Sequence, residues 1–401
     1  MEQHSNGTSH IGLSRRELMH RLATAGFTAP VIAAILAGEG LAQEATPEAT
    51  PPLAAEPGAD LREVFGLDER LIQYDPFNYG TPLDALDGAF LTPNELFFVR
   101  NNGPVPDIDP ASYRLTISGL VDSPQELTLD DLRNRETVTF TSFLECSGND
   151  RGFFEPNASG TQWRNSAIGN AEWTGTPLKP LLEEAGIQEG AVEIVSQGAD
   201  FAEMQRGLPL SDALAPDTML VWEMNGEELP KVHGGPVRLF VPGWGGIAST
   251  KWLIGIEVID HVFQGSLNTD SYTIVDPFDR RIRPVREMPV KSVIAIPAAG
   301  SEVSAGEQTI VGYAWSGYGG IAKVEVSTDG GTNWSDAEIV EEAGRLSWVK
   351  FEAPWDAQPG TTSLYARATD ELMMTQPSTV PWNARGYYYN AVFEVPVSVT
   401  E

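Results

Sequence analysis

The chain has 401 residues, with 26 Lys and Arg against 56 Asp and Glu, and a formal net charge of −30. This excess of acid excludes nucleic acid as a partner, because nucleic-acid binding needs a basic face. A single cysteine, Cys146, excludes an intramolecular disulfide, a four-cysteine zinc site and a CxxCH haem attachment. The acidity favours solubility, or adaptation to a salty or acidic setting, over a docking surface for a basic partner.

The first 42 residues have the pattern of an export signal. Paired arginines at 15–16 precede an apolar run over residues 22–36, which is typical of the twin-arginine route. The run is shorter than the ~20 residues of a membrane span, and Gly26 and Pro30 interrupt it. We therefore expect cleavage rather than a retained anchor, a periplasmic or extracytoplasmic protein, and no later membrane span. Because this route carries folded proteins, it also indicates a cofactor acquired in the cytoplasm.

The composition of the remaining chain predicts two folded domains. Residues 43–60 are rich in Pro, Ala and Glu, which predicts a disordered linker. The roughly 340 residues that follow exceed what one hydrophobic core usually holds. Residues 61–287 mix strand patterns with short helices, so we expect an α+β fold there. Residues 288–401 are nearly all short strands separated by turn signals, which is typical of an immunoglobulin-like β-sandwich.

Periodicity assigns several elements of the first domain. Strands are expected over residues 112–121, 191–200, 236–243 and 250–260. Alternation in the last of these predicts one face made of Trp252, Ile254, Ile256 and Val258.

A helix is expected over residues 176–186. Thr176 is predicted to be its N-cap, with Pro177 in the first turn and Gly186 at the end. Its buried face is predicted to consist of Leu178, Leu181, Leu182 and Ala185.

Six stretches place cationic or small residues beside glycine turns. They are residues 97–106, 145–151, 162–175, 232–252, 268–276 and 381–390. Taken alone, each favours an ordinary structural interpretation: Cys146 as a buried inert residue, His233 as a satisfied structural histidine. The glycine-rich turn before Lys251 also lacks the GxxxxGK[ST] order of a P-loop.

Taken together, these stretches predict a site for an anionic small molecule or cofactor. The chain is poor in basic residues, and yet several of them gather at glycine turns. Backbone N–H groups and arginine forks bind phosphate and oxyanion oxygens well. A thiolate among such cations has a lowered pKa and is able to ligate a metal.

In this order the stretches resemble the sulfite oxidase family of molybdenum enzymes, in particular its bacterial sulfite dehydrogenases. The likeness runs from about Arg62 to the C-terminus. It is carried by FFVRNNGPVP, ECSGN, GNAEWTG, HGGPVRLFVPGWGG followed by TKW, and VSTDGGTNW. The resemblance implies a mixed α/β molybdopterin domain followed by an immunoglobulin-like domain that often mediates dimerisation.

The resemblance also implies a cofactor and a reaction. Molybdenum is expected to be held by one pyranopterin dithiolene and by the thiolate of Cys146, and to oxidise sulfite to sulfate. No haem motif is found, so electrons are expected to pass to a separate acceptor such as a c-type cytochrome. The implied substrate residues are Arg100, Arg151, Trp163, Tyr272 and Arg385. The residues implied to bind the pterin and its phosphate are Asn101, Asn102, Asp200, His233, Arg238, Ser249, Thr250 and Lys251.

Two residues depart from the family pattern. Many relatives have histidine in place of Asn102, and a small or basic residue in place of Asp150. We expect Asp150 to add a negative charge beside the anion site, which weakens the case for sulfite. Two alternatives stay open: the same cofactor acting on nitrate, a sulfoxide or another oxyanion, and a non-catalytic protein that binds through its sandwich domain.

Overall fold

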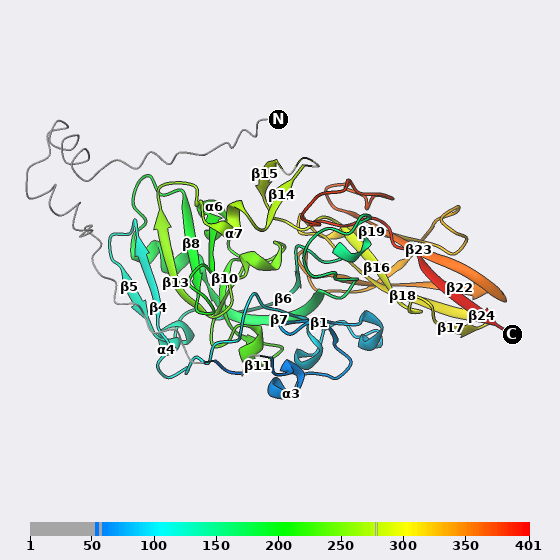
Figure 1. Ribbon diagram of the computed structural model, residues 1–401, viewed down its shortest axis with the longest axis horizontal. Coiled ribbons are helices and arrows are strands. Elements are labelled where there is room, and N and C mark those ends of the chain that lie inside the picture. Colours follow the sequence, from blue (N-terminus) through cyan, green and yellow to red (C-terminus); the bar gives the residue numbers. More distant parts are fainter. Residues whose placement is uncertain (1–52, 56–57, 277, 279) are drawn as a thin grey trace, which may run out of the picture. The chain divides into compact units, whose positions relative to one another are not determined.

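The structure of the protein, a computed structural model, describes residues 53–55, 58–276, 278 and 280–401 (Figure 1). The predicted export signal over residues 1–42 lies outside these ranges, as does most of the predicted linker. In the described part of the linker, the Ala54 amide donates to the Val105 carbonyl at 2.8 Å. No helix among the described residues is both long and apolar enough to cross a membrane.

Two five-stranded sheets form the scaffold of residues 61–287, called the N-terminal region below and drawn in blue to green in Figure 1. One sheet has the order β11-β10-β7-β6, with β12 also paired to β10. The other has the order β5-β4-β13-β8-β9, in which β13 runs parallel to β4 and antiparallel to β8. The strands of the first sheet are β6 (Val138–Glu145), β7 (Ile168–Pro177), β10 (Met219–Met224), β11 (Glu227–Glu228) and β12 (Arg238–Phe240). Those of the second are β4 (Leu115–Gly119), β5 (Gln125–Leu127), β8 (Glu193–Gly198), β9 (Gln205–Pro209) and β13 (Leu253–Ile259).

Smaller elements surround these sheets. A three-stranded sheet and a hairpin comprise β1 (Ile72–Asp75), β2 (Asn78–Gly80), β3 (Val99–Arg100), β14 (Thr273–Val275) and β15 (Arg281–Pro284). The helices are α3 (Leu61–Phe65), α4 (Leu129–Arg133), α5 (Leu178–Ala185), α6 (Leu210–Ala213) and α7 (Ser266–Thr269). The mixture of strands and short helices confirms the α+β character predicted for this region.

The predicted helix over residues 176–186 is α5, and its cap differs from the prediction. The buried face and the left-handed Gly186 at the C-cap, with φ of 75°, are as predicted. Thr176, however, is the penultimate residue of β7, and Pro177 is the N-cap residue without a side-chain bond. The sheet continues up to the helix because Thr176 pairs with Leu220 of β10.

The predicted strand over residues 250–260 is β13, but its faces change along its length. A register shift between Leu253 and Gly255 interrupts the alternation. As a result Leu253 packs with Ile256 and Val258 in one core, whereas Trp252 packs in another. The prediction of a single face was wrong here, because a β-bulge adds one residue and reverses the side-chain pattern.

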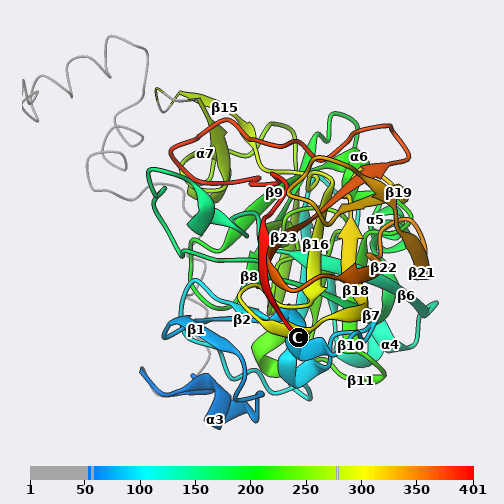
Figure 2. The ribbon, with the colours of Figure 1, turned by 90° about the vertical axis from the view of Figure 1, so that its right-hand side faces the viewer.

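Residues 288–401, the C-terminal region, form two sheets that pack on each other, and most of their strand pairs are antiparallel. Their orders are β16-β18-β22-β21 and β17-β24-β23-β19-β20. Buried residues of both sheets, including Phe351 of β22 and Leu364 of β23, share one hydrophobic cluster. Figure 2 turns this region toward the viewer. Its strands are β16 (Lys291–Ile296), β17 (Glu302–Ser304), β18 (Gly306–Trp315), β19 (Ile321–Ser327), β20 (Ser335–Asp336), β21 (Glu338–Glu342), β22 (Val349–Ala357), β23 (Gly360–Asp370) and β24 (Val395–Thr400).

The C-terminal region packs along β6, the strand that leads to Cys146. The amide of Phe143 donates to the Leu346 carbonyl at 3.1 Å, and the Phe143 ring lies 6.4 Å from that of Trp315. Tyr313 and Trp348 each donate a side-chain hydrogen bond, at 2.8 Å, to the backbone of residues 89–90. The two regions therefore share a core directly behind the strand that presents the cysteine.

Candidate active site

Cys146 lies at the point where β6 ends and a tight turn begins. Its amide donates to the Ala167 carbonyl at 2.9 Å, and its carbonyl accepts from the Asn149 amide at 2.8 Å. The side chain is 7% exposed, with a free thiol. Backbone bonds thus hold the cysteine in place while its sulfur reaches one cavity.

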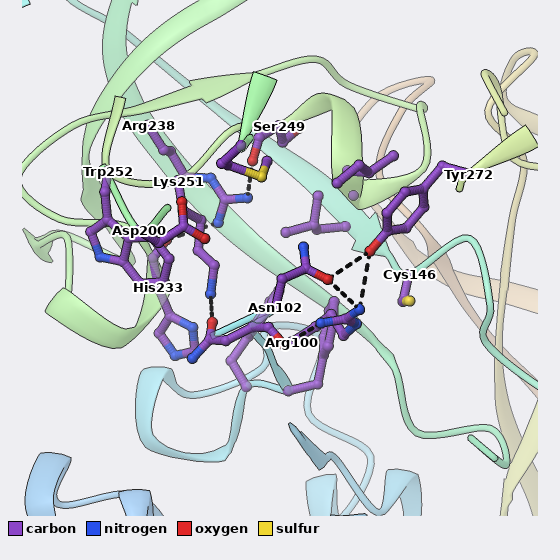
Figure 3. A pocket seen from close by; sticks show the side chains of 17 residues that line it. Arg100, Asn102, Cys146, Asp200, His233, Arg238, Ser249, Lys251, Trp252 and Tyr272 are labelled. Carbon is purple, nitrogen blue, oxygen red and sulfur yellow. Dashed lines mark hydrogen bonds between the residues drawn. The ribbon is translucent and has the colours of Figure 1, made fainter. Parts of the chain in front are cut away.

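That cavity brings together ten of the residues predicted for the site (Figure 3). These residues come from five stretches that lie far apart in the sequence, which explains why the motifs are spread along the chain. In Figure 3, Cys146 and Tyr272 lie on one side, and Arg238, His233 and Lys251 on the other. The ten residues are Arg100, Asn101, Asn102, Cys146, Asp200, His233, Arg238, Ser249, Lys251 and Tyr272.

Arg100 reaches the cavity from the end of β3. Its Nη2 donates to Asn102 Oδ1 at 2.7 Å and to the Tyr272 hydroxyl at 3.1 Å. Burial opposes the charge of Arg100, but the neighbouring Tyr272 and Cys146 favour it, and the net effect raises its pKa. The cavity therefore holds a permanently charged guanidinium on the side of the cysteine.

Arg151 and Arg385 are not among the described residues that line the cavity. Arg151 Nε donates to the Arg385 carbonyl at 3.0 Å, and its guanidinium lies 5.2 Å from the centre of the Tyr387 ring. Tyr387 in turn stacks on Tyr272 at 5.7 Å. The Arg151 side chain is thus one aromatic layer from the cavity, and contact of Arg151 and Arg385 with substrate stays a prediction.

The close approach of these segments requires a glycine at position 386. Gly386 has φ of 62°, and a Cβ built there would lie 2.5 Å from Arg151 Cγ. Only glycine accepts both the left-handed backbone and the contact. The WNARG motif therefore serves to bring the backbone of Arg385 against Arg151.

Trp163 is fully buried beside the same cysteine. It shares a hydrophobic cluster with Cys146 and packs on Tyr74 with 4.6 Å between ring centres. Its indole nitrogen is buried and has no hydrogen-bond partner among the described residues. It does not line the cavity, so the predicted role of Trp163 beside the substrate also stays a prediction.

The opposite side of the cavity is rich in buried cations. Arg238 donates to the His233 and Ser249 carbonyls at 2.9 and 2.8 Å, and Lys251 donates to the Val232 carbonyl at 2.9 Å. Burial lowers the pKa of Arg238 to about 9 and that of Lys251 well below its usual value. An anionic ligand beside these two desolvated groups would stabilise the charged form of each.

His233 and Asp200 add polar groups at this side. His233 Nε2 lies 3.1 Å from the Asn94 carbonyl, and burial lowers the pKa of the ring to about 3, so it is neutral. Burial also raises the pKa of Asp200 to about 6. Both shifts follow from low solvent access, which disfavours the charged form of each group.

The donor set fits a polar, anionic cofactor such as molybdopterin. Three buried atoms of residues that line this cavity lack a hydrogen-bond partner within the described residues: Asn101 Nδ2, Asp200 Oδ1 and Arg238 Nε. Buried polar atoms are rarely left unpaired in folded proteins. Their presence beside surplus cations indicates that a ligand with acceptors, a donor and negative charge completes the site.

Ser249 and Thr250 differ in their placement. Ser249 lines the cavity, and its Oγ accepts from the Val241 amide at 3.0 Å. Thr250 is buried and exchanges a hydrogen bond of 2.7 Å with Ser196 instead. The structure therefore brings Ser249 to the other site residues and leaves Thr250 outside the lining.

The cavity is also lined by residues that were not predicted as site residues, and most of them are apolar. These residues exclude water and support the polar groups. A signal for some of them was present, because Phe97 and Phe98 open the FFVRNNGPVP motif and Trp252 ends the TKW motif. The additional lining residues are Phe97, Phe98, Leu144, Met204, Gly246, Ile247 and Trp252.

Asp150 does not lie beside the anion site as expected. It is fully buried, is absent from the described cavity lining, and places Oδ2 2.7 Å from Lys291 Nζ of the C-terminal region. The expectation failed because it followed proximity in sequence to Arg151, whereas the turn directs consecutive side chains to different sides. The charge of Asp150 is thus offset by the ammonium group of Lys291.

Comparison with family models identifies two matching domains. An oxidoreductase molybdopterin-binding domain matches residues 102–267, and a Mo-co oxidoreductase dimerisation domain matches residues 283–400. The first contains most of the cavity residues, and the second coincides closely with the C-terminal region.

The chain is similar over most of its length to proteins named sulfite oxidase. It is 37% identical to sulfite oxidase of Arabidopsis thaliana, covering 78% of this chain and 89% of that protein. It is 36% identical to mitochondrial sulfite oxidase of Homo sapiens, covering 81% of this chain but only 65% of that protein. A more distant relative is a nitrate reductase [NADH] of Ulva prolifera, with 32% identity over 81% of this chain and 42% of that protein.

A solved structure with the same fold is the sulfane dehydrogenase SoxCD from Paracoccus pantotrophus. The TM-score is 0.74 at 31% identity, covering 92% of this chain and 96% of that chain. The similarity extends over both regions described above.

Proposed function

Since the chain belongs to the sulfite oxidase family of molybdenum oxidoreductases, we propose that it oxidises sulfite to sulfate at a molybdenum centre ligated by Cys146. The observation that carries this proposal is that Cys146 and Arg100 share one cavity with a cation-rich far side. A thiolate is a soft ligand suited to such a metal, and a guanidinium matches the oxygens of an oxyanion.

When bound, the molybdopterin cofactor supplies the two-electron redox chemistry and the oxygen transfer, as cofactors do in such enzymes. In this proposal Arg238, Lys251 and Ser249 hold its phosphate. His233, Asp200 and Asn101 bind its polar rings, the last two through the unpaired atoms described above. Asn102 and Thr250 remain candidates for the same role.

The protein's part in the reaction is to bind and orient the anion. Sulfite takes up an oxygen atom from water and releases two electrons and two protons in becoming sulfate. Arg100 binds the sulfite oxygens, and Tyr272 and Asn102 hold the guanidinium through bonds of 3.1 and 2.7 Å. Phe98 and Ile247 in the lining limit water, which strengthens each charge-assisted bond.

Further properties belong to the same proposal. The twin-arginine pattern supports export to the periplasm, and the electrons pass to a separate acceptor such as a c-type cytochrome. The two packed sheets support an immunoglobulin-like assignment for residues 288–401, and the match to a dimerisation domain supports a homodimer through that region.

A second candidate substrate is another oxyanion or oxo compound, such as nitrate or a sulfoxide. The placement of Arg151 favours it to a degree, since its Nε and Nη1 donate to the carbonyls of Arg385 and Thr161. Within the described lining, Arg100 is then the one arginine near Cys146, which suits a monoanion as well as a dianion.

The test is a substrate panel on purified, molybdenum-loaded protein. We expect about one molybdenum per chain and reduction of ferricyanide or cytochrome c with sulfite. Nitrate and a sulfoxide are assayed with a reduced dye as donor. Metal-free protein from a molybdenum-replete host would contradict the proposal, and turnover of nitrate without sulfite oxidation would favour the second candidate.

A further inference from the structure

A buried lysine of the C-terminal region contacts the turn that carries Cys146. Lys291, the first residue of β16, places Nζ 2.6 Å from Glu145 Oε1 and 2.7 Å from Asp150 Oδ2. All three side chains are at most 1% exposed. Charged side chains almost never reach such burial unless they are paired. The contact is therefore a specific feature of the packing between the two regions.

The two carboxylates stand at the two ends of the cysteine turn. Glu145 immediately precedes Cys146, and Asp150 immediately precedes Arg151. Asp150 also has a φ of 67°, a left-handed conformation that is unfavourable for a residue other than glycine. A backbone of this kind persists only when its surroundings hold it, and the bond to Lys291 is part of that support.

Two further hydrogen bonds fix the carboxylate of Glu145. Its Oε2 accepts from the indole N–H of Trp315 at 2.8 Å, and Oε1 also accepts from Asn149 Nδ2 at 3.0 Å. Trp315 ends β18, so two strands of the C-terminal region reach the same carboxylate. Within the described residues, Lys291 is the only cation paired with Glu145 or Asp150. Its loss would leave two buried carboxylates without a counter-ion.

We propose that Lys291 is a positioning residue for the metal ligand. By drawing Glu145 and Asp150 to one ammonium group, it fixes both ends of the turn and so directs the Cys146 sulfur into the cavity. The C-terminal region thereby contributes to the metal site of its own chain, in addition to any role in assembly. This inference rests on the proposed ligation of molybdenum by Cys146.

The single cysteine makes a direct test possible. Because Cys146 is the only cysteine in the chain, its alkylation by iodoacetamide reports on this turn alone. The full chain is purified from a host unable to make the pyranopterin, and the rate is compared for wild type and Lys291→Met. We expect at least a ~10-fold faster alkylation in Lys291→Met, because local opening exposes the thiol. In the holoenzyme we expect less molybdenum per chain and shifted Mo(V) EPR g values.

Two variants separate positioning from general destabilisation. Lys291→Arg keeps a cation and is expected to restore most of the wild-type protection of Cys146. Ser292→Ala is the matched control on the same strand, because the Ser292 side chain points to the opposite face and bonds Gln376 Oε1 at 2.6 Å. It removes a buried hydrogen bond of the C-terminal region and is expected to leave Cys146 alkylation and the EPR spectrum unchanged.

Trp315→Phe decides the question if Lys291→Met does not fold. It keeps an aromatic ring and leaves Lys291 in place, and it removes the N–H donor to Glu145 together with part of the indole ring. We therefore expect a smaller increase in alkylation, about two- to fivefold. Wild-type alkylation rates and wild-type EPR spectra in the folded variants would overturn the inference. The alkylation assay needs neither metal nor substrate, so its outcome is independent of whether sulfite is the substrate.

Discussion

The two sides of the cavity are built in different ways. On the cation-rich side, His233, Arg238, Ser249 and Lys251 all come from residues 233–251. Arg238 and Lys251 donate to backbone carbonyls within or next to that stretch, and His233 also contacts the Asn94 carbonyl of the N-terminal region. On the cysteine side, Cys146 and its neighbours are held by contacts from distant parts of the chain. The Arg385 carbonyl and the Lys291 ammonium both come from the C-terminal region.

This difference predicts that substitutions on the two sides impair different properties of the enzyme. The cation-rich side depends on the N-terminal region alone, so changes there are expected to affect cofactor binding. The cysteine side depends on the packing of the two regions, so changes there are expected to affect metal geometry and substrate affinity. The predictions below test that division.

The largest effect is expected for Cys146→Ser. Serine has nearly the same shape and keeps the turn, but it removes the thiolate that the proposal assigns to the metal, and a serine hydroxyl is far less acidic than a cysteine thiol. Sulfite turnover is expected to fall by more than the ~100-fold typical of losing an outer-sphere partner, measured as ferricyanide reduction. An unchanged thermal unfolding midpoint serves as the control for folding. Turnover within tenfold of wild type would contradict ligation by Cys146.

Matched arginine variants compare the two sides directly. Arg100→Gln removes a charge-assisted bond to substrate worth roughly 1.5–3 kcal/mol, so the KM for sulfite is expected to rise about 10- to 100-fold with molybdenum content unchanged. Arg238→Gln is expected to do the reverse, with lower molybdenum content and an unchanged KM in the loaded fraction. Equal loss of metal in both variants would show that the two sides do not act separately.

Much of this division was predictable from the sequence, because the cationic motifs and their glycine turns occur in a recognisable order. The placement of Arg100, Cys146 and Lys251 on one cavity follows that prediction. What the sequence did not reveal depends on long-range geometry: the bulge in β13, the pairing of Thr250 with Ser196, and the direction of Asp150 toward Lys291. A local pattern cannot identify a partner that lies 54 residues away, as Ser196 does from Thr250, or 141 residues away, as Lys291 does from Asp150.

The pH dependence of stability tests the burial of His233 in cofactor-free protein. Its folded pKa of about 3 lies below the 6.5 of a free histidine, so the unfolded chain binds the proton first as pH falls. Lowering the pH from 7 to 5 is therefore expected to remove about 2 kcal/mol from the free energy of unfolding through this group. His233→Gln is expected to lose less over that interval in urea titrations.

Asp200 provides the opposite control for that titration. Its folded pKa of about 6 lies above the 3.8 of a free aspartate, so the folded chain binds the proton first and gains stability as pH falls from 7 to 5. Asp200→Asn is expected to steepen the loss on acidification. Identical slopes in both variants and wild type would contradict the burial of these two groups.

The smallest effect is expected for Tyr272→Phe. The change removes the hydroxyl that accepts from Arg100 at 3.1 Å but keeps the ring that stacks on Tyr387. One hydrogen bond is worth about 1 kcal/mol, so KM for sulfite is expected to rise about fivefold with little change in kcat. A larger fall in kcat than in substrate affinity would instead assign Tyr272 a part in the chemical step.

The central claim is that Cys146 ligates the metal, and X-ray absorption at the molybdenum edge measures this directly. For the wild-type holoenzyme the account predicts sulfur scattering from the two dithiolene sulfurs and from Cys146, with the last contribution lost in Cys146→Ser. Identical sulfur coordination in the two proteins would contradict it.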